Sequence, residues 1–398
     1  MPKDSPPLKI FIIAGESSGD MLGGKLINAL KLKYPDINIW AVGGSSIASC
    51  GGHLVFDCQK IAVMGFWEVV PKAFSILMRI RQTVTAIEQF KPDILITIDS
   101  PGFNFRVVKQ VRKRFGTQFP IIHYIAPTVW AYKKERAKLV AKLYDHIMLL
   151  LPFEAPYFDE VGMSNTYVGH PIIEDIVEGS SGESAINVGP TQIPILIMPG
   201  SRLQEIASMG KIFKKALKIL IEQYHLNLMI MIPTKPNLQT QVQEIFGDLP
   251  NIFISCDDVI KQKFLKTAKL ALVKSGTSSL EMAIHNIPCV VGYKISWLSY
   301  ALIKRMIKIK YISLVNIILN RSVIPELIQS ECNPKKLAEK LHTIYSSSKT
   351  QGGITRSYQR VIKLLGNNSG SSPSDAAAGV VLEVLRVSHN ESTFSKFL

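Results

Sequence analysis

Short apolar runs alternate with longer amphipathic stretches along this chain, and this pattern restricts its fold more than any other feature. Runs of strand length recur through the first half, each followed by a segment long enough for a helix. Strands that alternate with helices are typical of βαβ units and a parallel sheet. We therefore predict an α/β domain with strands at Leu8–Ala14, Ile37–Val42, Asp93–Ile98, Ile121–Ile125 and His146–Leu150.

The same pattern starts again after Gly179–Gln192, a stretch rich in Gly, Ser, Asn and Pro. A chain of 398 residues is also too long for one ordinary hydrophobic core. We predict two Rossmann-like, doubly wound domains, residues 1–178 and 193–365, that face a cleft and bind ligands at the carboxyl ends of their strands. The predicted strands of the second domain are Ile193–Met198, Leu226–Ile232, Ile252–Ser255, Leu270–Val273 and Cys289–Val291.

The C-terminal part has a different character. Ser346–Gly353 and Gly366–Asp375 are rich in Ser, Gly and Asn, which predicts two loops. Ala376–Val387 has the pattern of a final helix. Residues 366–398 are therefore expected to form a flexible segment followed by a C-terminal helix.

Composition narrows the classes of function. The net charge is +15, from 46 Lys and Arg against 31 Asp and Glu, which predicts an anionic partner: nucleic acid, anionic lipid or a phosphorylated substrate. The five cysteines are scattered without a Cys-x-x-Cys pair, which fits a reducing cytosol and argues against structural zinc. His123, His146 and His170 are not interpreted as metal ligands. We expect neither a metal nor a cofactor.

The apolar segments are too short to cross a bilayer. The first run, Leu8–Ala14, reads as a strand before a Gly-rich turn and not as the core of a signal peptide. No run of about 18 uncharged apolar residues follows it. We expect a chain that can touch a membrane but does not span it.

A Ser-Gly-Thr turn lies between a predicted strand and a helix that carries Glu281. The amides of Ser275, Gly276, Thr277 and Ser278 are placed where a helix N-terminus concentrates positive charge, which suits a diphosphate. Glu281, one turn later, can accept hydrogen bonds from ribose hydroxyls. The alternative is a turn that merely caps the helix.

Other polar groups follow other predicted strands. Asp99 follows Asp93–Ile98 and suits a general base, unless it only caps the next helix. Arg202 ends a Pro-Gly-Ser-Arg turn and can bind a phosphate with two parallel hydrogen bonds, or be an ordinary surface arginine. Glu16 and Ser18 lie in a turn without the G-x-G-x-x-G spacing of dinucleotide sites, which can hold a sugar or simply cap a helix.

Two basic amphipathic stretches suggest contact with a membrane surface. No Asp or Glu occurs between Met282 and Pro325, and Lys304, Arg305 and Lys308 lie off an apolar helical stripe there. A core helix with a solvated basic face is the alternative. The second stretch, Gly65–Val84, has apolar side chains that could enter a lipid headgroup layer, and a helix that faces the core is the alternative. These side chains lie among Lys72, Arg79 and Arg81, and they are Phe66, Trp67, Phe74, Leu77 and Met78.

The ordered motifs resemble one known family, the lipid-A-disaccharide synthases, which are inverting glycosyltransferases with two Rossmann-like domains of the GT-B type. The resemblance extends to about residue 340. The motifs that carry it are GESSGD (15–20), MGFWEV (64–69), IDSPGFN (98–104), HYIAPTVWAY (123–132), YVGHP (167–171), PGSR (199–202), SGTSSLE (275–281) and the segment Asn316–Gln329.

The resemblance implies a reaction in lipid A (lipopolysaccharide) biosynthesis. A 2,3-diacylglucosamine unit passes from its UDP derivative to the 6-hydroxyl of 2,3-diacylglucosamine 1-phosphate, which forms a β-1,6-linked disaccharide and UDP. It also implies a peripheral enzyme on the cytoplasmic face of the bacterial inner membrane, an anionic membrane surface as partner, and no nucleic acid. A homodimer is possible, because the C-terminal end can be swapped between subunits in the family.

The resemblance also implies roles for single residues. Asp99 is similar to the family's base, Arg202 to the diphosphate contact, and Ser275–Ser278 with Glu281 to the UDP cradle. Asn316 is expected to touch the donor, and Glu16 and Ser18 to line the acceptor side. Ser17 stands where Ala is common and Val315 where Pro is usual. Alternatives are another UDP-sugar enzyme, such as a peptidoglycan glucosaminyltransferase or an epimerase, and a non-catalytic lipid or nucleotide-sugar binding protein.

Overall fold

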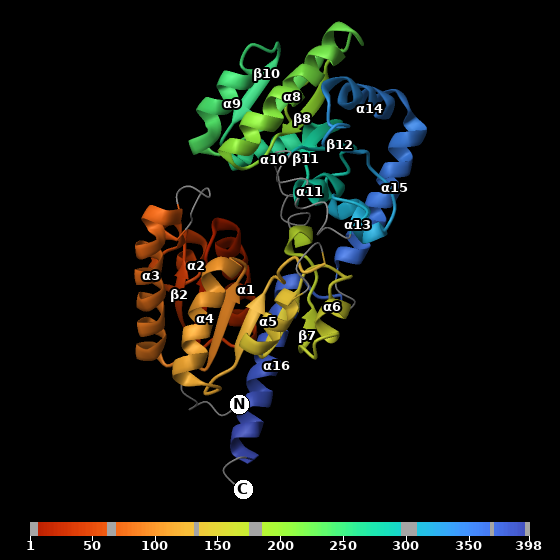
Figure 1. The fold of residues 1–398 in the computed structure, drawn as a ribbon. Coiled ribbons are helices and arrows are strands. Elements are labelled where there is room, and N and C mark those ends of the chain that lie inside the picture. Colours follow the sequence, from red (N-terminus) through yellow and green to blue (C-terminus); the bar gives the residue numbers. More distant parts are fainter. Residues whose placement is uncertain are drawn as a thin grey trace. The chain divides into compact units, whose positions relative to one another are not determined.

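The computed structural model describes residues 7–61, 69–130, 135–174, 185–295, 309–366 and 370–394. The chain divides into two compact units. The first unit is Met1–Pro171 together with Leu365–Leu398, and the second unit is Ile172–Leu364. Figure 1 shows a sheet with helices on its faces in each unit, and each is described here by itself.

The first unit contains a seven-stranded sheet in the order β3-β2-β1-β4-β5-β6-β7, and all of its paired strands are parallel. The central strands are apolar and buried on both faces, as expected for a parallel sheet covered by helices. The strands are β1 (Leu8–Ala14), β2 (Ile37–Gly43), β3 (His53–Asp57), β4 (Ile94–Ile98), β5 (Ile121–Tyr124), β6 (His146–Leu149) and β7 (Asn165–Tyr167).

Helices cover both faces of this sheet (Figure 1). On one face α3, α4 and α5 lie side by side, and on the other α1 contacts both α2 and the C-terminal helix α16. Helix α16 therefore packs on the first unit of its own chain. The helices are α1 (Ser17–Lys33), α2 (Ser45–Ser49), α3 (Val69–Phe90), α4 (Pro101–Phe115), α5 (Glu135–Leu143), α6 (Ala155–Asp159) and α16 (Pro373–Phe394).

The second unit contains a six-stranded parallel sheet in the order β10-β9-β8-β11-β12-β13. Its strands are β8 (Ile193–Met198), β9 (Leu228–Pro233), β10 (Ile252–Ser255), β11 (Leu270–Lys274), β12 (Cys289–Tyr293) and β13 (Glu326–Ile328). Helix α8 packs between α9 and α14. The helices are α8 (Leu203–Glu222), α9 (Gln239–Phe246), α10 (Asp258–Thr267), α11 (Ser278–Ile284), α13 (Leu314–Leu319), α14 (Pro334–Ser346) and α15 (Ser348–Leu365).

Both sheets reverse their direction of growth once, between β1 and β4 in the first unit and between β8 and β11 in the second. We call these the first and the second switch point. In open α/β sheets, ligands bind beyond the carboxyl ends of the strands at such points. The predicted α/β class with two doubly wound parallel sheets is confirmed.

Every predicted strand is present, with ends that differ by at most two residues. Three strands were missed: β3, β7 and β13. Each of these strands is short and lies at the edge of its sheet. Because an edge strand carries polar or half-buried residues, it lacks the continuous apolar run that marks a central strand.

The predicted loop Ser346–Gly353 is wrong, because α15 begins at Ser348. Ser347 supplies the reason: its hydroxyl accepts the N–H of Thr350 at 3.2 Å, as a helix cap does. Tyr358 and Val361, with Ile354 and Leu365, then form a buried stripe that outweighs the glycines at the start of the helix. The predicted final helix Ala376–Val387 is confirmed and extends over Pro373–Phe394.

Candidate functional site

A tight turn with an unusual backbone places Asp99 at the first switch point. Asp99 and Ser100 have φ angles of +48° and +44°, in the left-handed region that non-glycine residues rarely adopt. The buried Asn104 stabilises this turn, because its Nδ2 donates to the carbonyl oxygens of Ile98 at 3.1 Å and Asp99 at 2.7 Å. Backbone strain that neighbours hold in place is a common property of functional sites.

Gly15 ties the end of β1 to this turn. A Cβ atom at Gly15 would lie 2.4 Å from the Oγ of Ser100, so only glycine allows the two strand ends to approach this closely. The predicted residues Glu16 and Ser18 follow Gly15 and are exposed, at the same carboxyl edge as Asp99. The structure therefore brings Asp99, Glu16 and Ser18 to one edge of the sheet.

The Asp99 carboxyl is partly withdrawn from water. Burial raises its pKa above the ordinary value of 3.8, and a hydrogen bond from the Ser100 N–H offsets part of this effect. No ion pair to Asp99 forms within the described part of the chain. A carboxylate with a raised pKa, and with no cationic partner among the described residues, is a stronger proton acceptor than an ordinary aspartate.

The last residue of the GESSGD motif has a structural role. The buried Asp20 carboxylate accepts the N–H groups of Gly44 at 2.6 Å, Ser46 at 2.9 Å and Ile47 at 3.2 Å. It thereby holds the turn between β2 and α2. Asp20 therefore stabilises the start of α2 and does not cap α1, whose N-terminus has no side-chain cap, while Ser17 and Ser18 are exposed.

A pocket of about 450 Å³ lies at the second switch point, and we call it the second-unit pocket. Its wall contains every predicted UDP-side residue except Asn316: Arg202, Ser275, Gly276, Thr277, Ser278 and Glu281. Gly200 and Gly276 shape its two loops with φ angles of +140° and +152°, which favour glycine. The sequence motifs after β8 and β11 therefore converge on one cavity.

The same pocket contains charged residues that the sequence analysis missed. Glu205 accepts hydrogen bonds from Lys274 Nζ at 2.9 Å, from the Ser201 N–H at 3.0 Å and from Arg202 Nη1 at 3.3 Å. Burial acts to raise the pKa of the Glu205 carboxyl, but these donors and the positive charge of Lys274 outweigh it, and the net pKa is lowered. Glu205 is therefore ionised at neutral pH.

The predicted ribose-binding acid is also paired. Glu281 Oε1 lies 2.7 Å from Lys261 Nζ on helix α10. This pair holds the Glu281 carboxylate at the wall of the pocket. The spacing of 20 residues gives no sequence signal for it, because the contact depends on how α10 and α11 pack around the strand ends.

Asn316 does not line the second-unit pocket. It is fully buried, its Nδ2 donates to the Ile324 oxygen at 2.9 Å and Glu326 Oε1 at 2.8 Å, and its Oδ1 accepts the N–H groups of Val323 and Ile324. Its route to the pocket is indirect: Glu326 also binds the Ile312 amide, and the Ile312 oxygen accepts the Ser275 hydroxyl at 2.9 Å. The expected contact with a donor stays a prediction.

Of the residues expected at a membrane, Phe74 and Leu77 lie on α3, with side chains 72% and 53% exposed. Met78 beside them is also exposed. The others fall outside the described residues: Phe66, Trp67, Lys304, Arg305 and Lys308. Within the described ranges, no helix combines the length and apolar character needed to cross a bilayer.

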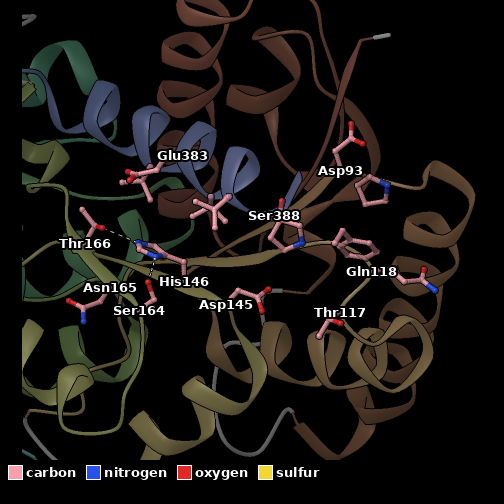
Figure 2. A pocket seen from close by; sticks show the side chains of 16 residues that line it. Asp93, Thr117, Gln118, Asp145, His146, Ser164, Asn165, Thr166, Glu383 and Ser388 are labelled. Atoms are coloured by element: carbon pink, nitrogen blue, oxygen red, sulfur yellow. Dashed lines mark hydrogen bonds between the residues drawn. The ribbon is translucent and has the colours of Figure 1, made fainter. Parts of the chain in front are cut away.

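A larger cavity, of about 990 Å³, lies at the opposite edge of the first sheet, beside α16 (Figure 2). His146 points into it and is hydrogen-bonded to Ser164 Oγ at 2.8 Å and Thr166 Oγ1 at 3.0 Å. Burial lowers the pKa of His146, and the charge of Glu383 opposes this. None of the predicted site residues lines this cavity, so the candidate sites are those at the two switch points.

Solved structures with the same fold are found among nucleotide-sugar enzymes. A UDP complex of MnaA from S. aureus has a TM-score of 0.67 at 15% identity and covers 96% of this chain and 97% of that one. UDP-GlcNAc 2-epimerase from Neisseria meningitidis bound to UDP-GlcNAc has a TM-score of 0.64 at 11% identity, with coverage of 90% and 99%. At these identities the likeness concerns the fold alone.

The sequence comparisons are more specific. A family model described as lipid-A-disaccharide synthetase matches residues 10–380. The lipid-A-disaccharide synthase of Rhodospirillum centenum is 37% identical over 384 residues, which covers 95% of each chain. That of Rickettsia bellii is 37% identical over 380 residues and covers 94% of this chain and 98% of its own. The chain therefore belongs to the lipid-A-disaccharide synthase family, whose members are glycosyltransferases of lipid A biosynthesis.

Proposed function

We propose that the enzyme transfers 2,3-diacylglucosamine from its UDP derivative to the 6-hydroxyl of 2,3-diacylglucosamine 1-phosphate. The products are the β-1,6-linked disaccharide 1-phosphate and UDP. One observation carries this proposal: the second-unit pocket gathers the loops after β8 and β11, with Arg202 and Glu281, around a single cavity. The UDP and UDP-GlcNAc complexes of proteins with this fold support it further.

In this proposal the second-unit pocket holds the donor. Arg202 is open to solvent there, with a side chain 74% exposed, and it can reach the diphosphate with two parallel hydrogen bonds. The Glu281 carboxylate accepts the ribose hydroxyls. Because Gly276 has no side chain, the turn around it lets a phosphate approach the backbone.

Asp99 is the proposed general base. It removes the proton from the acceptor 6-hydroxyl while that oxygen bonds to the anomeric carbon of the donor. The bond from this carbon to the UDP oxygen breaks on the opposite side, which inverts the configuration, and the released UDP keeps the bonding electrons. The raised pKa of Asp99 suits this proton transfer, and Arg202 offsets charge on the leaving diphosphate.

Glu16 and Ser18 are proposed to contact the acceptor, because they share the carboxyl edge of the first sheet with Asp99. The acyl chains of both substrates require a lipid surface. Helix α3 already fills the core with Ile80, Val84 and Ile87, so its exposed Phe74 and Leu77 are free for the bilayer. We propose that the enzyme binds peripherally to the cytoplasmic face of the inner membrane. From the sequence pattern alone, we propose that Lys304, Arg305 and Lys308 also contact the membrane surface.

The test is turnover of the purified chain with both acylated substrates in detergent micelles. Expected are equal amounts of UDP and disaccharide, with a β-linkage read from the coupling constant of the anomeric proton. UDP released without the acceptor, or no disaccharide at all, would contradict the proposal. Formation of a 2-epimer from UDP-GlcNAc in the absence of acceptor would favour the epimerase alternative.

A further inference from the structure

We propose that Lys274 is a second cation for the donor diphosphate and that Glu205 is the positioning residue that presents it. This inference rests on the proposed donor site and adds two residues to it. Neither lies in the motifs by which the sequence resembles its family. Lys274 immediately precedes the Ser-Gly-Thr turn, and Glu205 lies in the first turn of α8.

Lys274 is fixed in place before any ligand arrives. It is the last residue of β11, it lines the second-unit pocket, and its side chain is only 17% exposed, against 74% for Arg202. Its Nζ lies 2.9 Å from Glu205 Oε1 and 5.3 Å from the centroid of the Tyr293 ring. A cation that is already ordered loses little side-chain entropy when it binds an anion.

Glu205 joins the two loops of the pocket. One carboxylate oxygen accepts the Ser201 N–H of the loop after β8, and the other accepts Lys274 from the end of β11. Gly200 makes room for this arrangement, because a Cβ there would lie 2.6 Å from the Cβ of Glu205. The carboxylate therefore sets the distance between the Arg202 loop and Lys274.

The Glu205 carboxylate lies inside a pocket proposed to bind an anion, and its charge alone would repel that ligand. The ammonium group of Lys274 has three N–H donors and gives only one of them to Glu205. The others remain available to phosphate oxygens. Arg202 Nη1 donates to the same Glu205 oxygen at 3.3 Å, and Glu281 pairs with Lys261 at another part of the wall. Glu205 thus holds Lys274 in a defined position, although its negative charge repels the diphosphate.

The experiment is calorimetric titration of the full chain with UDP, UMP and uridine. If Lys274 binds the diphosphate, Lys274→Ala weakens UDP binding about ten- to a hundredfold, the range expected for a charge-assisted hydrogen bond. Uridine affinity stays within about twofold of wild type. Lys274→Arg recovers most of the lost UDP affinity. A Lys218→Ala variant, which removes an exposed lysine from the far end of α8, changes none of the three.

Glu205→Gln separates positioning from simple repulsion. The proposal predicts weaker UDP binding, because the amide holds Lys274 less firmly, with no loss for uridine. Tighter UDP binding by Glu205→Gln would contradict the positioning role. Equal losses for UDP and uridine in Lys274→Ala would mean a merely structural residue and would also overturn the inference.

The outcome also separates this inference from the proposed function. If the wild-type chain binds no UDP, both the proposed donor site and this inference are wrong. If wild type binds UDP and Lys274→Ala binds it equally well, only the inference is wrong, and the donor site remains.

Discussion

The two switch points share one strand topology but differ in how their carboxylates are paired. At the first, Asp99 stands without an ion pair among the described residues, in a left-handed turn, with a raised pKa. At the second, Glu205 and Glu281 each accept a lysine. Topology thus sets where a site forms, while the pairing of its charges sets what the site does. An unpaired carboxylate suits proton transfer, and paired charges suit binding.

The largest expected effect tests the first switch point. Asp99→Asn should lower kcat about 10²- to 10⁴-fold, because the amide cannot accept the proton, while KM for the UDP-sugar changes little. Steady-state assays of UDP release measure both. Asp93→Asn is the matched control at the other end of β4, where an amide oxygen can still accept the Lys9 N–H. A comparable loss in both variants would contradict a specific role for Asp99.

The next effect tests the second switch point. Arg202→Ala should lower kcat/KM for the UDP-sugar about ten- to a hundredfold, because a charge-assisted contact with the diphosphate is lost. Arg202 is mostly exposed, so the melting temperature should stay close to that of wild type. Lys218→Ala, on the helix α8 that follows Arg202, serves as control. Unchanged kinetics with Arg202→Ala would break the assignment of this edge to donor binding.

A smaller effect tests whether α3 of the first unit contacts lipid. Replacing Phe74 and Leu77 together by serine should reduce flotation with anionic vesicles about tenfold, because exposed apolar area is removed. UDP affinity should not change. Leu32→Ser, at a side chain 83% exposed on α1, controls for the loss of any surface apolar group. Equal flotation of all variants would exclude this patch as the lipid contact.

The smallest effect is on stability. Burial raises the pKa of Asp99 in the folded chain, so ionisation of Asp99 costs stability as the pH rises from the ordinary value of 3.8 through the raised value. Asp99→Asn should therefore melt about 1–4 °C higher than wild type at neutral pH. The difference should shrink as the pH falls through 3.8 and vanish well below it, where Asp99 is protonated in both the folded and the unfolded chain. Thermal melts across this range measure it, and a variant that is less stable at neutral pH would refute the burial argument.

Much of the fold and part of the site could be predicted from local pattern. Buried parallel strands such as β4 and β8 are continuous apolar runs, and a polar group directly after a run, such as Asp99 or Arg202, must lie at the carboxyl edge. The Ser275–Ser278 turn could be placed in the same way, because it directly follows the apolar run of β11. Because both sheets have the same type of strand order, Asp99 lies at the switch point of the first unit, and Arg202 and the turn lie at that of the second.

The remainder depends on pairing between distant residues. Lys274 and Glu205 are 69 positions apart, and the sequence around either residue does not predict the contact between them. Asn104 reads as an ordinary helix residue until its amide is seen to bind the carbonyl oxygens of Ile98 and Asp99. Asn316 was expected at the ligand, yet its polar atoms are all bonded inside the unit, and sequence pattern cannot separate these two roles.

The central claim is that the two switch points divide the work, with catalysis at the first and donor binding at the second. Its most direct test is the Kd of UDP for Asp99→Asn and Arg202→Ala, measured by calorimetry in one buffer. We expect a Kd close to wild type for Asp99→Asn and one about tenfold or more weaker for Arg202→Ala. A loss of UDP affinity in Asp99→Asn as large as that in Arg202→Ala would contradict it.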